Sequence, residues 1–316
     1  MYCICLFRDM LIVAFILRVS LWSSVAEARR GVVADLHDRS FEMLIAGGHL
    51  PDSSYLVRHI VSIRTLNYIE FRGDNHFCSG ILLSSRAVLT AAHCVTDWFK
   101  APMNPRALLI VFGSRLRLAF YDVAECRRVD RLVLHPEYKR YKENDLAVLQ
   151  LSQRIPSNMR HVRPLVTRDS SGFATAGKRC ITMGWGQVYP HGPYSNQILA
   201  LDVLIRNHSF CEGKIPSYNR AGHLCAEPDA DGEFCPGDMG GPLICEDWLA
   251  GIIGGSHLCE GGKAMKFTNY MHHEKWIQKT VLALTAQAAD PFSPTNTLSL
   301  LLLSQLFSLI IQLNRI

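Results

Sequence analysis

Short apolar runs, each about the length of a β-strand, recur along the chain from residue 45 to about residue 283. Within each run the residues are apolar or alternate between apolar and polar, and Gly, Pro, Asn or Asp separates one run from the next. This pattern predicts many short strands. The absence of a sequence repeat of about 20 to 50 residues argues against a propeller or a solenoid. The expected strands are residues 59–63, 78–84, 87–93, 107–113, 130–135, 146–151, 180–185, 242–246 and 249–255.

The pattern changes to a helical period after these runs. Trp276, Ile277, Thr280 and Leu284 fall on one face of a helix over residues 270–284. We therefore expect an all-β body that is closed by one C-terminal helix.

The first 28 residues have the layout of a targeting signal. Arg8 precedes an apolar run, and small residues follow it up to Ala28, which is typical of a secretory signal peptide. The alternative is a membrane anchor, for which the apolar run is short. We interpret residues 1–28 as the signal peptide and residues 29–44 as a short pro-segment.

Residues 286–316 are expected to form a linker and a hydrophobic tail. The apolar run 298–313 is shorter than the roughly 20 residues that span a bilayer. Small residues, a polar spacer and this run together match a GPI-anchor signal. The polar stripe of Ser304, Ser308 and Gln312 instead fits an amphipathic helix that binds a membrane or a partner. Both interpretations stay open, as does a short anchor or a trimmed tail.

Cysteine usage agrees with export from the cell. The chain has 11 cysteines, and nine remain once Cys3 and Cys5 leave with the signal peptide. An exported chain of this kind is expected to form disulfides, and the odd number leaves one cysteine over.

The net charge of +5 is too small to indicate nucleic acid as a partner. No metal-ligand spacing is present, so we expect neither a metal nor a cofactor.

Three segments carry the candidate chemistry, in this order: "LTAAHC" at residues 89–94, "NDLAVLQL" at residues 144–151 and "EFCPGDMGGPLIC" at residues 233–245. They supply a histidine base, an aspartate that orients it, and a position for a nucleophile. The three residues at these positions are His93, Asp145 and Met239.

These segments resemble those of the chymotrypsin-like (trypsin-type) serine proteases. The resemblance covers roughly residues 45–285 and includes "IAGG" at residues 45–48, "CITMGWG" at residues 180–186, "HLCAE" at residues 223–227 and the tryptophan-bearing terminal helix. It implies two six-stranded antiparallel barrels of Greek-key type, with the site in the cleft between them. It also implies the disulfides Cys78–Cys94, Cys180–Cys245, Cys211–Cys225 and Cys235–Cys259. Cys126 has no partner in the family, which leaves a buried thiol or a bridge to another chain as interpretations.

Met239 stands where the family has its nucleophilic serine. A thioether has no proton to give up and cannot form an acyl-enzyme. The resemblance assigns the oxyanion hole to the backbone N–H groups of Gly237 and Met239. His93 and Asp145 match the family's base and its orienting residue, although a hydrogen bond that holds the fold together would explain their presence equally well.

The substrate pocket and the activation site also depart from the family. Gly254, Gly255 and Ser256 stand where the family commonly has Ser-Trp-Gly, and Met265 replaces a glycine of the pocket wall. Glu233 lies near the position that sets the charge at the floor of the pocket. We therefore expect a degenerate pocket.

In the family, cleavage after a basic residue frees an N-terminus that pairs with the aspartate before the nucleophile. Ile45 and Asp238 match these two partners, but Leu44 precedes the cleavage site. A trypsin-like activator is therefore not expected to cut here.

Two further features are expected on the surface of the protein. Asn207, His208 and Ser209 form an N-glycosylation sequon. Residues 126–142 are rich in Arg and Lys, which we interpret as a solvated rim in preference to a polyanion site.

The sequence predicts a secreted, extracellular, non-catalytic serine protease homologue that acts by binding proteins. Its role would be that of a cofactor, scaffold or decoy in an immune, clotting or reproductive pathway, and its partners would include active serine proteases or their inhibitors. The alternatives are a recognition module tethered to the cell surface through the C-terminal tail, and a residually active serine-type endopeptidase.

Overall fold

The computed structural model describes residues 48–51, 54–119, 125–165, 174–215, 217–229, 232–255, 259, 261 and 263–286. The expected signal peptide, pro-segment and C-terminal tail lie outside the described residues, as do Ile45 and Ser256.

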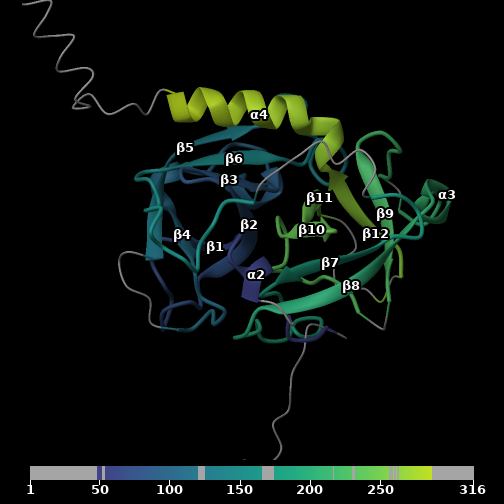
Figure 1. Cartoon of the computed structure of the whole chain (residues 1–316), viewed down its shortest axis with the longest axis horizontal. Coiled ribbons are helices and arrows are strands. Elements are labelled where there is room, and N and C mark those ends of the chain that lie inside the picture. The colour runs from purple at the N-terminus through teal and green to yellow at the C-terminus, as the bar shows by residue number, and fades with distance from the viewer. Residues whose placement is uncertain are drawn as a thin grey trace, which may run out of the picture. The chain divides into compact units, whose positions relative to one another are not determined.

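The first six strands close into a barrel in the order β1-β2-β3-β6-β5-β4, and every pair is antiparallel (Figure 1). Large aliphatic side chains that are fully buried, among them Ile63, Leu82 and Leu149, fill its interior. The strands are β1 (Ile60–Thr65), β2 (His76–Ser84), β3 (Ala87–Thr90), β4 (Leu108–Phe112), β5 (Cys126–Leu134) and β6 (Ala147–Leu151).

The next six strands close into a second antiparallel barrel in the order β10-β11-β12-β9-β8-β7. The two barrels lie side by side in Figure 1, and together they confirm the predicted all-β class with two six-stranded barrels. The strands are β7 (Arg179–Gly184), β8 (Leu199–Arg206), β9 (His223–Pro228), β10 (Pro242–Cys245), β11 (Trp248–Ile253) and β12 (Met265–Asn269).

The C-terminal helix α4 (Tyr270–Ala286) lies across β3 and β6 of the first barrel (Figure 1). Ile277, Thr280 and Leu284 are buried on one face of it, as their helical spacing predicts. Gln150 of β6 donates a hydrogen bond to the carbonyl of Leu284 (2.5 Å), which satisfies one of the carbonyls that a helix end leaves open. The helix therefore continues from the second barrel and packs on both barrels, because it also contacts β11.

The remaining helices are short: α2 (Ser54–Val57), η1 (Ala92–Val95), η2 (Pro105–Ala107) and α3 (His208–Cys211). No helix of the described residues is both long enough and apolar enough to cross a membrane.

Four disulfides join the cysteine pairs that the family resemblance implied: Cys78–Cys94, Cys180–Cys245, Cys211–Cys225 and Cys235–Cys259. Cys126, which begins β5, takes part in none of them. Four disulfides in one domain are consistent with an oxidising, extracellular compartment.

Candidate functional site

His93 and Asp145 meet between the barrels. His93 sits in the single turn η1 that follows β3, and Asp145 comes directly before β6. The His93 ring donates from Nδ1 to Asp145 Oδ2 (2.7 Å), and the His93 backbone N–H donates to Asp145 Oδ1 (2.9 Å). This bidentate contact fixes both the position and the tautomer of the imidazole, with Nε2 turned away from the carboxylate.

The Asp145 carboxylate is buried and stays ionised. Burial on its own would raise the pKa of Asp145, but attraction to His93 and hydrogen bonds from His93 and from the Gly255 N–H (3.3 Å) outweigh it and lower the pKa. The side chain of His93 is only 9% exposed. The base and its orienting group are therefore assembled, but solvent hardly reaches the imidazole.

The turn that carries Met239 is fixed to the first barrel. Ser79 of β2 donates its N–H to the Met239 carbonyl (2.7 Å), and both Ser79 Oγ and His76 Nε2 donate to the carbonyl of Gly237 (3.1 Å each). Cys94 Sγ lies 3.9 Å from His93 Nε2 and 3.7 Å from the Met239 carbonyl oxygen. The segment with Met239 thus lies beside His93, where the family resemblance places it.

The turn that carries Met239 has a glycine before and after it at positions where neighbouring atoms leave no room for a Cβ. A Cβ at Gly240, which has φ +78°, would lie 2.2 Å from Thr90 Oγ1 and 2.4 Å from the Ser79 carbonyl oxygen. A Cβ at Gly237, which has φ +102°, would lie 2.7 Å from the Tyr194 ring. The described part of the chain accepts no hydrogen bond from the N–H groups of Gly237 and Met239. The two donors of the predicted oxyanion hole are therefore available.

Met239 itself is 3% exposed and belongs to the core cluster that joins the barrels. Residues 235–241 contain no hydroxyl group, and the sulfur of Cys235 is held in a disulfide. The turn consequently offers His93 no group from which to remove a proton.

Asp238 is buried beneath the same turn. Its carboxylate accepts the N–H of Gly186 (2.7 Å) and the N–H of Cys235 (3.0 Å). Burial raises the pKa of Asp238 to about 7 although these hydrogen bonds favour the ionised form. The partner that the family resemblance gives to Asp238 is the N-terminus at Ile45, which lies outside the described residues.

Large buried side chains lie at two positions of the expected substrate pocket. Met265 of β12 is 3% exposed, and Phe234 is buried with its ring packed edge-on against Phe267 (5.2 Å between centroids). The Glu233 carboxylate accepts the N–H of Gly261 (2.8 Å). The cavity that Glu233, Phe234 and Asp238 help to line holds only about 10 Å³, which is at the limit for one water molecule.

Tyr141 lies beside both His93 and Gly255. Its ring centroid lies 5.5 Å from that of His93. A Cβ at Gly255 would lie 2.5 Å from Tyr141 Cδ1 and 3.2 Å from His93 Cε1. At Gly254 a Cβ would lie 3.9 Å from Asp145 Oδ2, so a serine there would bring its hydroxyl towards the carboxylate. The tyrosine thus takes the space of a side chain at residue 255.

Polar contacts hold Tyr141, whose φ is +57°, in this position. Its carbonyl accepts hydrogen bonds from Lys266 Nζ (3.1 Å) and from Ser217 Oγ (2.8 Å), and Lys266 also donates to Ser217 (2.8 Å). Burial lowers the pKa of Lys266 to about 8, although Asp145 opposes this shift. On the outer side the guanidinium of Arg140 stacks on the Tyr141 ring (4.9 Å) and on Trp98 (5.3 Å).

The sequence analysis did not identify Tyr141, Lys266 or Phe234 as parts of the site. The available signal for Tyr141 was indirect, because a glycine in place of the pocket tryptophan leaves a volume that another residue has to fill. For Lys266, the signal was its place between the apolar residues Met265 and Phe267.

Among the described residues, His93, Cys78 and Cys94 bring three potential metal ligands within 4.8 Å of one another. Both sulfurs are bonded to each other, so they offer no thiolate to a metal.

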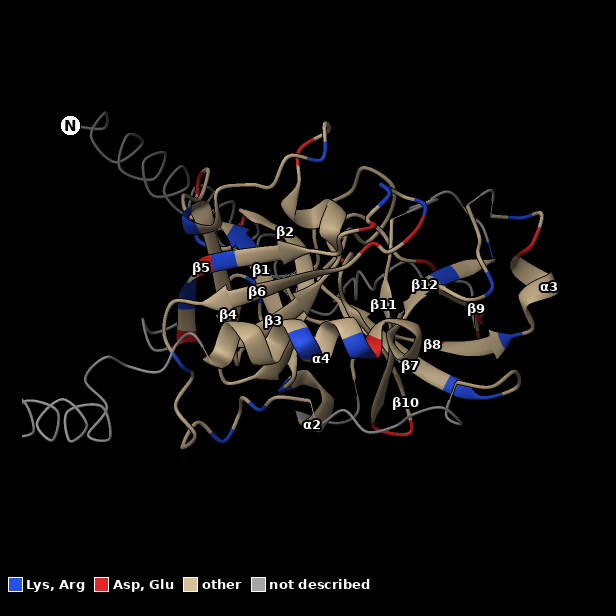
Figure 2. Ribbon diagram, turned by 90° about the horizontal axis from the view of Figure 1, so that it is seen from above, with Lys and Arg blue, Asp and Glu red and all other residues tan. Residues whose placement is uncertain are grey.

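The remaining predicted residues lie on the surface. Asn207 is exposed at the start of α3, and its side chain makes no capping hydrogen bond there, so a glycosyltransferase would find it accessible. In the basic segment, Lys139 pairs with Glu143 (2.8 Å), and Arg128 and Arg131 are exposed on β5. Blue basic positions appear on β5 and α4 in Figure 2.

Comparison with known proteins places this geometry in a family. The family model described as Trypsin matches residues 52–277. Granzyme C of Mus musculus is 28% identical over 217 residues, which are 68% of this chain and 83% of the relative. The venom plasminogen activator Haly-PA of Gloydius brevicauda is 30% identical over 235 residues, 71% of this chain and 84% of the relative. The solved structure described as "Structure of GrC" superposes with a TM-score of 0.62 at 26% identity and covers 74% of this chain and 98% of that one. The chain therefore belongs to the trypsin family of chymotrypsin-like serine proteases.

Proposed function

We propose that this chain is a non-catalytic member of the trypsin family that works outside the cell by binding other proteins. The observation that carries the proposal is the buried Met239 beside the ordered pair of His93 and Asp145. A base that is oriented correctly does no acyl-transfer chemistry without a nucleophile to deprotonate.

The side chains around His93 support the same proposal. Met265 and Phe234 are buried at positions where the family has its pocket, and the Tyr141 ring lies beside that of His93. A substrate peptide needs room for its side chain next to the base, and large side chains at these positions take up that room.

The intact contact between His93 and Asp145 has a structural explanation. It joins the turn after β3 to the segment before β6, and the Gly255 N–H ties the same carboxylate to the second barrel. Removal of either partner would leave a buried polar group unpaired, which costs about 1–3 kcal/mol. In this proposal the pair stabilises the interface between the barrels.

The proposal includes the secreted location, the glycan on Asn207 and the protein partners. The partners would be active serine proteases or their inhibitors, for which the chain would act as a cofactor, scaffold or decoy. The tethered recognition module is the alternative, and it differs from the soluble form in what becomes of residues 286–316.

Catalysis is tested first. The body would be produced with an engineered cleavage site so that its chain begins at Ile45, and it would be assayed against a fluorogenic peptide library and a fluorophosphonate probe. We expect no turnover above that of the His93→Ala variant. Hydrolysis that disappears in His93→Ala would overturn the proposal in favour of the endopeptidase.

Binding is tested next, by affinity capture with the glycosylated body from extracellular fluid, followed by mass spectrometry. Recovery of active proteases or their inhibitors would support the cofactor or decoy. Recovery of adhesion proteins or receptors instead would favour the recognition module, and release of the protein from cells by a phosphatidylinositol-specific phospholipase would indicate tethering.

A further inference from the structure

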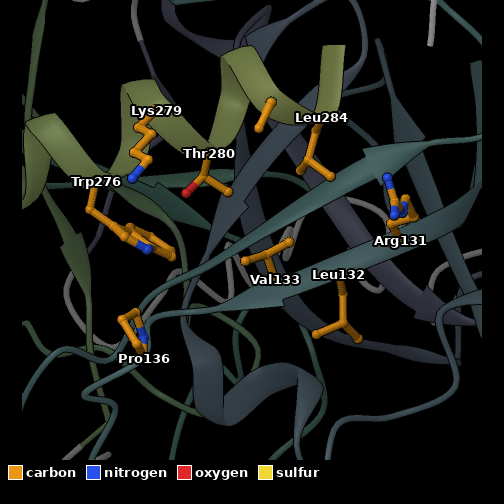
Figure 3. Close-up of a pocket in the computed structure, with 9 residues that line it drawn as sticks. Arg131, Leu132, Val133, Pro136, Trp276, Lys279, Thr280 and Leu284 are labelled. Carbon is orange, nitrogen blue, oxygen red and sulfur yellow. The ribbon is translucent and has the colours of Figure 1, made fainter. Parts of the chain in front are cut away.

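An apolar groove of about 550 Å³ lies between β5 and α4 (Figure 3). Leu132 and Val133 line it from the strand, and Trp276 and Ala283 line it from the helix. Trp276 and both strand residues are only partly buried, and Ala283 is exposed. The body by itself therefore leaves a concave apolar surface next to the end of its last helix.

The opposite flank of α4 has a second apolar hollow of about 300 Å³, lined in part by Val281 and Leu282. Leu282 is 67% exposed. Exposed apolar surface that continues around a helix commonly marks a contact site. The groove by β5 is the larger of the two hollows and is the one that reaches Leu284, in the last turn of α4.

The charges around the groove restrict what fits it. Arg131 on β5 and Lys279 on α4 both line it, and none of its lining residues is acidic (Figure 3). A positively charged segment would be repelled, and a segment without charge would lose no ionic hydration on entering.

A segment of this chain meets these requirements. Residues 298–313 contain no charged residue and are rich in Leu and Ile. With helical spacing, Leu300, Leu303, Phe307 and Ile310 fall on one face, which gives a continuous apolar stripe. A helix of that pattern needs an apolar surface to cover the stripe.

The connection is long enough to reach. Residues 287–297 separate α4 from this segment, and 11 extended residues span up to about 36–40 Å. The 17 residues of α4 measure about 25 Å along its axis. A short tether holds the segment at an effective concentration in the millimolar range, so even a weak contact would be well populated.

We propose that residues 298–313 dock as an amphipathic helix in the groove between β5 and α4, with their apolar stripe on Val133, Trp276 and Ala283. This inference does not depend on the loss of catalysis. It gives the hydrophobic tail an intramolecular binding site, which competes with its use as a membrane contact.

The test is a photo-crosslink within the full chain. Phe307 is replaced by benzoylphenylalanine, which keeps an aromatic side chain on the apolar stripe, and the crosslinked peptides are mapped by mass spectrometry after illumination. We expect monomeric protein with crosslinks to residues 131–136 and 276–284. The same probe at Ser308, on the polar side, is the positional control and should give few such crosslinks.

Two helix variants keep the test specific. Ala283→Glu puts a charge into the groove and should lower the crosslink yield about fivefold or more. Leu282→Glu puts the same charge on the opposite flank and should change the yield less than about twofold, since it lies outside the groove. Both positions are exposed, and a far-UV spectrum checks that each variant is folded.

Three results would overturn the inference. Crosslinks that map to the opposite flank of α4, crosslinked dimers on a denaturing gel, or a mature protein from secreting cells from which residues 298–313 have been removed would each exclude this docking.

Discussion

The ring of Tyr141 occupies the space that a side chain at residue 255 would need, since a Cβ on Gly255 would lie 2.5 Å from Tyr141 Cδ1 and 2.6 Å from Cε1. The same ring lies beside His93, with 5.5 Å between centroids. Gly255 and Tyr141 therefore depend on each other, because the missing side chain at Gly255 leaves the space in which the Tyr141 ring lies beside His93.

The first prediction concerns this pair of residues directly. Gly255→Ala should destabilise the fold by about 1–3 kcal/mol, because the added methyl group overpacks against Tyr141. Gly222→Ala is the matched control, since a Cβ there meets no atom within 4 Å. Urea unfolding measures both. Adding Tyr141→Ala to Gly255→Ala should recover most of the loss, and a double-mutant cycle without coupling would contradict the contact.

The second prediction is that restoring a nucleophile does not restore the enzyme. In Met239→Ser the new hydroxyl would lie in the turn beside His93, but Met265 and Phe234 still place large buried side chains at the pocket positions, and the Tyr141 ring still lies beside the base. Loss of the serine in a comparable triad costs about a millionfold in turnover, so a real gain is easy to detect. We expect peptide hydrolysis no faster than in Met239→Ser combined with His93→Ala. Turnover that requires His93 would show that the pocket is open.

The sequence was sufficient to predict the two barrels, the terminal helix and the four disulfides. It did not predict that the Tyr141 ring lies beside His93. The position of that ring depends on the backbone of Tyr141, which has φ +57°, and on a hydrogen bond from Lys266, a residue 125 positions away along the chain. Strands β8, β9 and β12 were not among the expected runs. In β9 and β12, His223 and Lys266 are buried polar residues that interrupt the apolar pattern. Hydrophobic patterning reports burial of apolar side chains, and it cannot recognise a polar side chain that is buried with hydrogen-bond partners.

The third prediction follows from Asp238. Burial raises the pKa of Asp238 to about 7 from its ordinary value of 3.8, so the folded state holds a proton that the unfolded state releases. Stability should therefore fall as the pH rises from about 4 to about 7, by up to roughly 4 kcal/mol. Urea unfolding of the uncleaved chain at pH 5 and pH 7.5 measures this, and Asp238→Asn should flatten the dependence.

Cleavage before Ile45 gives the matching control for Asp238. The new α-ammonium group, with an ordinary pKa near 8, is expected to pair with the carboxylate and keep it ionised. The cleaved form should then lose the decline between pH 5 and pH 7.5. An identical pH dependence in both forms would rule out that pairing.

The last prediction concerns Lys266, which donates hydrogen bonds to the Tyr141 carbonyl and to Ser217 Oγ and so holds the Tyr141 loop in place. Burial lowers its pKa to about 8 from 10.5, so between these values the unfolded state binds a proton that the folded state has released. Stability contributed by this group should rise with pH from about 8 to about 10.5, by on the order of 3 kcal/mol.

The variant Lys266→Met keeps much of the side-chain volume without the charge, so it should remove this rise. Its free energy of unfolding should stay close to that of the parent protein at pH 7, because isosteric replacement of a buried charge is often neutral or stabilising. Unfolding curves at pH 7, 8.5 and 10 for the two proteins give the comparison. A difference between them that does not change with pH would mean that Lys266 does not titrate in this range and that its hydrogen bonds alone hold the loop.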